Sequence, residues 1–526
     1  MMRSLAICVC LACCGFPLMA ADPAPVPKSP GHAGVLANAV LSARIDSLVL
    51  DRLAEEKIPV SSRASDAEFL RRVYLDLAGR IPTATEAKTF LDSTDTARRA
   101  QLVDTLLAGQ DHARHMADIW QTLLLARNSD ARRLQREPFV LWLGEQFQAN
   151  KPYNTLVREI LTAEGPQDKN PATTFWLSQV TVDHMTDTVG KVFMGTQLQC
   201  AQCHNHPFTG WKQDEYWGMA AFFLKVQPRL PRGKDMGTPE VKESPRVQKA
   251  RKNLPESVKF VEPKFFGGAR PKVKETAPLR PVLADWLCAS DNPFLARATV
   301  NRLWAQMYGR GLVHPVDNIN DTNPASHPEL LEELTTQFQA NGFDLRAILR
   351  AMALSETYQR SSKPIPGNAD ALAEAYARMP IKVLGPEQLF DSLVTVLGQP
   401  GQGAATARKM MVTKMAGQNG PRAQFLAMFE GDVDADATEY QAGIPQVLNL
   451  MNSPRMNTPA AAVRLSQGLS SEEAIRHLYL ATLSRPPLAA ETTLALNHLR
   501  SAEAPRQALA DILWALLNST AFASNH

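Results

Sequence analysis

Two cysteines and two histidines lie within seven residues of the chain, at Cys200, Cys203, His204 and His206. The spacing C-x-x-C-H is the one by which c-type haem is attached to a polypeptide. In that chemistry the two thiols add to the vinyl groups of the porphyrin, and the adjacent imidazole binds the iron as proximal ligand. The motif therefore predicts covalent haem c on Cys200 and Cys203, with His204 as an axial ligand.

Two other interpretations of the same residues stay open. A Cys200–Cys203 disulfide is favoured by an oxidising compartment and would suit a non-catalytic secreted scaffold. Thiolate and imidazole are also the usual ligands of Zn, which could brace the domain or serve hydrolysis of envelope glycans. Four ligands within seven residues would strain a tetrahedral site, so a Zn site here needs a ligand from elsewhere. No other acid–base or nucleophile constellation is evident, so the sequence leaves open whether the protein is an enzyme.

A haem iron or another metal at this motif would need further ligands. His184 and Met185 lie in a predicted helix upstream of the cysteines, Met219 lies downstream, and His206 follows the motif directly. A sixth ligand from this set would favour electron transfer, whereas an open position would allow small-molecule chemistry. Aromatic residues that could wall a macrocycle also cluster here: Phe208, Trp211, Tyr216, Trp217, Phe222 and Phe223.

The first residues of the chain predict export. Residues 1–20 combine a basic start at Arg3, an apolar core too short to span a bilayer and a small residue at Ala20, as in a secretory signal peptide. Residues 21–34 are expected to form a disordered mature start. Cleavage before Cys14 is the alternative, and it would add a lipid tether. The protein is thus expected in the periplasm or at the cell envelope, where electrons would pass to an unknown redox partner.

Bulk composition limits the function classes. The 526-residue chain has a formal net charge of +3, which gives no reason to propose nucleic acid as a partner. No later apolar run is long enough to cross a bilayer. Four of the seven cysteines lie in the leader, which leaves Cys200, Cys203 and Cys288. An odd number argues against a disulfide-built scaffold.

Hydrophobic periodicity predicts a mostly α fold with little β, beginning with a helix over residues 35–56. One helical joint occurs twice, because residues 72–87 align without a gap to residues 477–492. In the first copy Gly79 is a natural helix C-cap, and a capping box follows it. A weaker echo links residues 348–358 to residues 512–522. The joints are either two pseudo-equivalent sites or, the simpler interpretation, one hairpin packing used at both ends.

The composition changes between the two helical regions. Residues 225–277 are rich in Pro, Gly, Lys and Arg, which indicates a basic linker between helical domains at 35–224 and 278–526. A short strand is expected at residues 259–266. Residues 317–323 are oxygen-rich, but Ile319 takes a position that an EF-hand loop gives to a ligand. We therefore interpret that stretch as a turn that leads into a helix.

Three segments together resemble a known pair of families. They are YLDLAGRIPTATEA, CAQCHNHPFTGWKQDEYWGMAAFF, and the long stretch that begins LADWLCASDNPFLARATVNRLWAQMYGRGL. The resemblance is to large secreted proteins of planctomycetes and related bacteria. A cytochrome-like domain of unknown function, 1549, is followed there by domain of unknown function 1553. The resemblance covers nearly the whole mature chain and implies a cytochrome-like role for Cys200, Cys203 and His204. Members often carry a His two residues past the motif, here His206, which keeps a non-haem metal open. A separate N-terminal cytochrome module is absent, so electron transfer would rest on this one site.

Overall fold

The computed structural model describes residues 35–125, 134–205, 210–231, 237–245, 261–398, 420–428 and 459–526. The predicted fold class is confirmed, because helices dominate and the strands are few and short. The α-helices are α1 (Asn38–Glu55), α2 (Asp66–Ala78), α3 (Ala84–Asp92), α4 (Arg98–Ala108), α5 (Gln110–Leu124), α6 (Glu137–Gln148), α7 (Tyr153–Thr162), α8 (Thr174–Gln179), α9 (Val182–Val189), α10 (Gln213–Ala220), α11 (Arg280–Leu287), α12 (Leu295–Tyr308), α13 (Pro328–Ala340), α14 (Leu345–Leu354), α15 (Pro386–Leu397), α17 (Pro421–Ala427), α19 (Pro459–Ser466), α20 (Ser471–Leu483), α21 (Ala489–Ser501) and α22 (Pro505–Leu517). None of these helices is long and apolar enough to cross a membrane.

Short helical turns and strands complete the described elements. The turns are η2 (Pro171–Thr173), η3 (Gly190–Met194), η4 (Gln199–Gln202), η5 (Ala221–Phe223) and η7 (Ala373–Ala375). The strands are β1 (Gly165–Pro166), β2 (Val226–Arg229), β3 (Glu240–Glu243), β4 (Lys382–Val383) and β5 (Ser524–Asn525). Strands β1, β3 and β2 form an antiparallel sheet in that order, and β4 pairs with β5.

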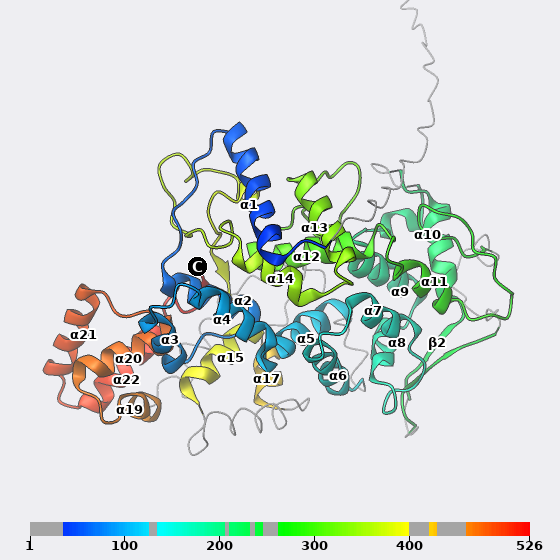
Figure 1. Ribbon diagram of the computed structural model, residues 1–526. Helices are drawn as coiled ribbons and strands as arrows, with labels where there is room; N and C mark the ends of the chain where they lie inside the picture. Colours follow the sequence, from blue (N-terminus) through cyan, green and yellow to red (C-terminus); the bar gives the residue numbers. More distant parts are fainter. Residues whose placement is uncertain are drawn as a thin grey trace, which may run out of the picture.

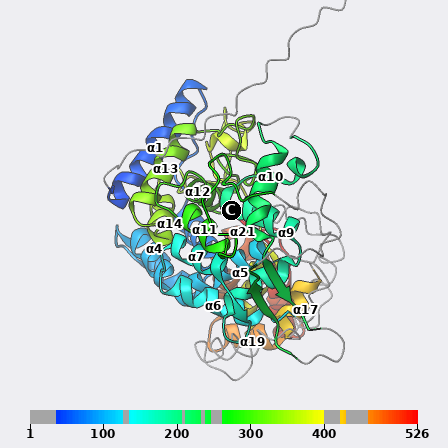
Figure 2. The ribbon, with the colours of Figure 1, turned by 90° about the vertical axis from the view of Figure 1, so that its right-hand side faces the viewer.

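The helices form an elongated body whose two ends carry different elements. Helices α8 to α11 and the small sheet lie at one end, and α19 to α22 lie at the other (Figures 1 and 2). One hydrophobic core runs from α1 through α14 and therefore draws on both predicted helical regions. A second core joins α15 and α19 to α22, and Leu75 and Ile81 also belong to it. The proposed domain boundaries remain predictions, but the two regions share buried surface.

The segment between the two helical regions is partly built into the core. Val226 of β2 and Val241 of β3 are fully buried. The strand expected at 259–266 is wrong for the described part, residues 261–266, which forms a turn. There Lys264 N donates to Gly218 O at 3.0 Å, and Phe265 stacks on Phe222 with ring centroids 5.5 Å apart. The apolar residues of this stretch are therefore anchors for a turn rather than one face of a strand.

The first copy of the repeated joint is built around Arg80. Gly79 ends α2 in the left-handed region at φ 69°, as its position predicted. The Arg80 guanidinium makes two parallel hydrogen bonds of 2.9 Å to the Glu86 carboxylate and lies 5.2 Å from the Tyr74 ring centroid. Glu86 also accepts from Thr83 N at 2.7 Å, and Thr83 Oγ1 accepts from Glu86 N, so the capping box is confirmed.

The second copy repeats these contacts. Ser484 takes the left-handed place at φ 60°, and Arg485 makes two hydrogen bonds of 2.7 and 2.8 Å to Glu491. The Arg485 guanidinium lies 5.6 Å from the Tyr479 ring centroid, and Leu488 N donates to Glu491 at 2.7 Å. Helix α20 packs against α3, so the two hairpins meet. The contacts agree with one hairpin packing used twice.

The weaker echo corresponds to two turns with the same hydrogen bonds. Ser355 Oγ, just past α14, accepts from Tyr358 N at 3.1 Å. Ser519 Oγ, just past α22, accepts from Phe522 N at 3.2 Å. Each hydroxyl thus accepts from a backbone N–H of the turn that follows the helix, a local bond that serine side chains commonly make.

Two adjacent arginines of α2 hold these two turns. Arg72 Nη1 donates to Tyr358 O at 2.7 Å, and Arg71 Nη2 donates to Phe522 O at 2.7 Å. Both guanidinium groups are fully buried. Helix α2 therefore fastens the end of α14 and the C-terminal end of the chain, which lies beside it in Figure 1.

The two joints offer a matched test of burial. Arg80→Ala is expected to lower the free energy of unfolding by about 2–3 kcal/mol, because the buried guanidinium binds the carboxylates of both Glu86 and Asp111. Arg485→Ala should cost less than about 1 kcal/mol, because its side chain is 28% exposed against 7% for Arg80. Urea unfolding of both variants measures the difference. Equal losses of unfolding free energy in the two variants would contradict the claim that burial makes the Arg80 contacts the stronger ones.

Candidate functional site

The Cys/His motif lies on a short turn whose inner side chains anchor it. Helix α9 runs into the π-helical turn η3, Gly190–Met194, and Gly195 in the left-handed region redirects the chain toward η4, Gln199–Gln202. Leu198 and Ala201 are buried, and Ala201 N donates to Leu198 O at 2.9 Å. The residues between and after these anchors consequently face outward.

The two thiols share the outer face of this turn. Cys200 lies within η4 and Cys203 follows it directly, and both side chains are exposed. Side chains three residues apart eclipse each other in a 3₁₀ turn, so the two thiols lie on one side. Cys200, Cys203 and the buried Cys288 are all free thiols in the structure.

His204 is exposed and has one ring nitrogen engaged. Its Nδ1 lies 2.7 Å from the carbonyl oxygen of Asn205. A carbonyl can only accept a hydrogen bond, so this contact assigns the proton to Nδ1 and leaves the Nε2 lone pair available. The tautomer that a metal ligand needs is thus the one that the local backbone favours.

Helix α10 clamps the far end of the turn. Trp217 Nε1 donates to Gln202 O at 3.1 Å. Gln213 Nε2 donates to Gln202 O at 3.1 Å and to Cys203 O at 3.0 Å. Gln213 N also donates to Asn205 Oδ1 at 3.0 Å. These bonds satisfy the carbonyls of the turn and hold its backbone while the thiols stay exposed.

A family model described as a protein of unknown function (DUF1549), PSCyt2, matches residues 44–228, which include the whole Cys turn. A second model, PSD1, described as a protein of unknown function (DUF1553), matches residues 279–499. The chain is a DUF1549–DUF1553 protein. This confirms the resemblance seen in the sequence. No curated protein and no solved structure matches it.

The candidate further ligands of this DUF1549–DUF1553 protein differ in exposure. His184 is exposed on α9, whose first turn is capped by Thr181 Oγ1, which accepts from His184 N. Met185 and Met219 are fully buried, so either thioether would have to leave the core to reach a ligand on the outer face. His206 lies outside the described residues.

The aromatic residues near the motif belong to the core. Tyr216, Trp217, Phe222 and Phe223 are buried and pack in the main core. Trp211 is half-buried, with its ring centroid 4.3 Å from that of a core phenylalanine in the 261–266 turn. Phe208 lies outside the described residues. In this structure the described rings are packing residues of the core next to the turn rather than walls of an open slot.

Two buried polar atoms on α9 and α10, the helices on either side of the Cys turn in the sequence, were not predicted from the sequence. Among the described residues, Asp187 Oδ1 on α9 and the Tyr216 hydroxyl on α10 have no hydrogen-bond partner. Burial raises the pKa of Asp187 to about 6, Lys191 lowers it and Asp183 raises it further. Burial also raises the pKa of the Tyr216 phenol, and the two aspartates add to that shift. In the sequence, the four-residue spacing of Asp183 and Asp187 indicates only that these two carboxylates lie on one face of a helix.

A preformed metal cluster is not seen in the described ranges. Within them no group of three or more His, Cys, Asp or Glu side chains converges in a way that could hold a metal ion. Cys200, Cys203 and His204 are therefore presented outward rather than gathered around a common centre. A Zn site at the motif would need a contribution from His206 or a rearrangement of the turn.

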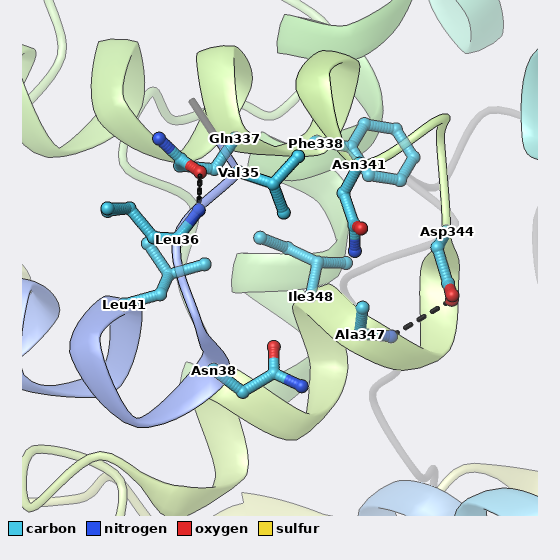
Figure 3. Close-up of a pocket in the computed structure, with 10 residues that line it drawn as sticks. All are labelled: Val35, Leu36, Asn38, Leu41, Gln337, Phe338, Asn341, Asp344, Ala347 and Ile348. Atoms are coloured by element: carbon cyan, nitrogen blue, oxygen red, sulfur yellow. Dashed lines mark hydrogen bonds between the residues drawn. The ribbon is translucent and has the colours of Figure 1, made fainter. Parts of the chain in front are cut away.

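A small pocket lies far from the motif in sequence and is lined by different elements. It is enclosed by the start of α1 and by α13 and α14, with Gln337 and Ile348 among its walls (Figure 3). Its cavity volume is about 10 Å³, the room of roughly one water molecule. Leu36 N donates to Gln337 Oε1 at 2.9 Å, and Asp344 caps α14. This pocket is a packing feature of the N-terminal segment.

Proposed function

We propose that this protein is exported to the cell envelope and transfers electrons through a haem c held by Cys200 and Cys203. Each thiol would add across one vinyl group of the porphyrin, so that an S–H and a C=C bond become a thioether with no other reactant. The haem would supply one-electron chemistry, and its redox partner would be another envelope protein.

The observation that carries this proposal is the shared outer face of the two thiols. Covalent attachment needs both sulfur atoms accessible from one side at once. The buried anchors Leu198 and Ala201 turn Cys200 and Cys203 outward together, and both are free. A structural pair of cysteines would more often be buried or already joined.

His204 fits the role of axial ligand. Its Nδ1 proton is held by Asn205 O, which leaves Nε2 free to bind iron. Among the described candidates for a further iron ligand we propose His184, because it is exposed on α9 whereas Met185 and Met219 are core residues. Gln213 and Trp217 hold the turn and keep both thiols and the imidazole on the outside.

The test is the visible spectrum of the full chain, exported together with cytochrome c maturation machinery. A Soret band and haem staining that survives denaturing electrophoresis are expected. Both should be lost in the double variant Cys200→Ala/Cys203→Ala and reduced in each single variant, in which one thioether can still form. Cys288→Ala is the matched control, because this thiol is buried away from the turn and its loss should leave the colour unchanged.

Other outcomes identify the alternatives. A folded, colourless protein would contradict the haem proposal. Stoichiometric Zn in that protein, lost in Cys200→Ala, would assign a metal site. The absence of free thiols in Cys288→Ala without metal would assign a disulfide.

A further inference from the structure

The turn that presents the thiols is held from a second side by residues of the DUF1553 region. Ile319 N donates to Gly195 O at 2.8 Å, five residues before Cys200. Gln197 Nε2 donates to Asp317 Oδ1 at 2.9 Å, two residues further on. The segment that leads into the Cys turn is therefore bonded to the 317–319 stretch at two successive points.

The contact at Gly195 leaves no room for a side chain. Gly195 has φ +65°, a conformation that residues with a Cβ rarely adopt. A Cβ there would lie 2.8 Å from Ile319 Cδ1 and 3.1 Å from the Cβ of Ala298 on α12. The chain direction at Gly195 and the close approach of the DUF1553 region thus depend on the same glycine.

The segment that directly precedes the 317–319 stretch is fixed to α12. Asn301, which is fully buried, accepts from Val313 N at 2.9 Å and donates to Val313 O and Val316 O. Helix α12 also packs against η3, where Arg302 Nη2 donates to Lys191 O at 3.1 Å. The Cys turn of the DUF1549 region is therefore held in part by buried residues of the DUF1553 region.

We infer that α12 and residues 312–319 of the DUF1553 region are part of the DUF1549 site, with Asp317 and Gly195 as positioning residues for Cys200 and Cys203. Helix α10 holds the end of the turn, and the 317–319 stretch holds its beginning. Together they set the direction in which the thiols and His204 face. Only the haem readout of this inference rests on the proposed function, because thiol reactivity reports the position of the turn in any case.

The test measures alkylation of Cys200 and Cys203, each followed on its own peptide by mass spectrometry, in the full chain without cofactor and in a Cys288→Ala background. Asp317→Ala should raise the alkylation rate of Cys200 and Cys203 at least threefold, because Gln197, at the start of the turn, loses its bond to Asp317. The free energy of unfolding should change little, since Asp317 is only half-buried. Asp321→Ala is the matched control, an exposed aspartate of the same loop, and its rate should equal that of the parent. Gly195→Ala should raise the rate more than Asp317→Ala.

Rates unchanged in both Asp317→Ala and Gly195→Ala would overturn the inference. So would an equal rise in Asp321→Ala, which would indicate a general effect of charge. A colourless parent with altered rates in Asp317→Ala would leave the positioning role standing and remove the haem. A parent that carries haem, together with unchanged alkylation rates in Asp317→Ala and Gly195→Ala, would keep the haem and remove the positioning role. In the coloured protein, a changed ligand band in Asp317→Ala supports the same role.

Discussion

Asp76→Ala is expected to lower the free energy of unfolding by about 3–5 kcal/mol, because it leaves a buried ammonium without its counter-ion. Asp76 on α2 is 3% exposed. Its carboxylate accepts from Lys382 Nζ at 2.6 Å, from Asn525 Nδ2 at 2.7 Å and from Tyr358 OH at 2.7 Å. One side chain thus joins α2 to both strands of the β4–β5 pair and to the turn after α14.

Urea unfolding followed by circular dichroism measures this loss. The matched control is Asp104→Ala, which breaks an ion pair to Arg350 at a half-exposed site and should cost less than about 1 kcal/mol. Lys382→Met in an Asp76→Ala background should recover part of the loss, because the uncompensated charge is then removed. A cost for Asp76→Ala no larger than that of Asp104→Ala would contradict the role of the network.

Acidification from pH 6.5 to 4 should remove on the order of 3 kcal/mol of stability for each of two buried histidines. Burial lowers the pKa of His112 to about 4, although Leu77 O accepts from its Nδ1 at 2.8 Å, and burial lowers that of His115 to about 4. Both rings are neutral in the folded state, whereas the unfolded chain binds protons from about pH 6.5 downward. Their contribution is therefore present above pH 6.5 and is lost as the pH falls toward 4.

The measurement is the free energy of unfolding at several pH values between 7 and 4. His115→Gln should reduce the loss over that interval by the share of one ring, on the order of 3 kcal/mol, since that ring no longer titrates. The comparison is made within each variant, so any constant destabilisation by the substitution cancels. The same pH dependence in His115→Gln and the parent would contradict the assignment.

Features with local causes were predictable from the sequence. Gly79 at the end of α2 and the Thr83–Glu86 capping box depend on residues within one or two turns, and both are confirmed. The repeat also predicted the second joint, although Ser484 there takes the left-handed place of a glycine. The buried arginines of α2 were not predicted, because the carbonyls that bind them are hundreds of residues away in the chain.

Strands in the 225–277 segment were missed for a similar reason. Strand β2 pairs with β3 antiparallel, with Val226 opposite Glu243, across residues with little alternation of apolar and polar side chains. The two strands are held in place by Val226 and Val241, which insert into the helical core. The turn at residues 261–266 shows the converse, because its aromatic residues suggested a strand and instead anchor a loop.

The site was found in the sequence, but its support was not. The spacing of Cys200, Cys203 and His204 indicates their chemistry directly. The bond between Gln197 and Asp317 joins residues 120 positions apart, so no local pattern could indicate it. The oxygen-rich stretch around Asp317 was interpreted as a turn before a helix, and its contact with the Cys segment appears only in three dimensions.

The intact mass of the exported full chain, measured after denaturation, tests the central claim most directly. We expect a mass increased by one haem, absent in the double variant Cys200→Ala/Cys203→Ala and retained in Cys288→Ala. The mass of the bare chain, or that mass less two hydrogens as in a disulfide, would contradict it.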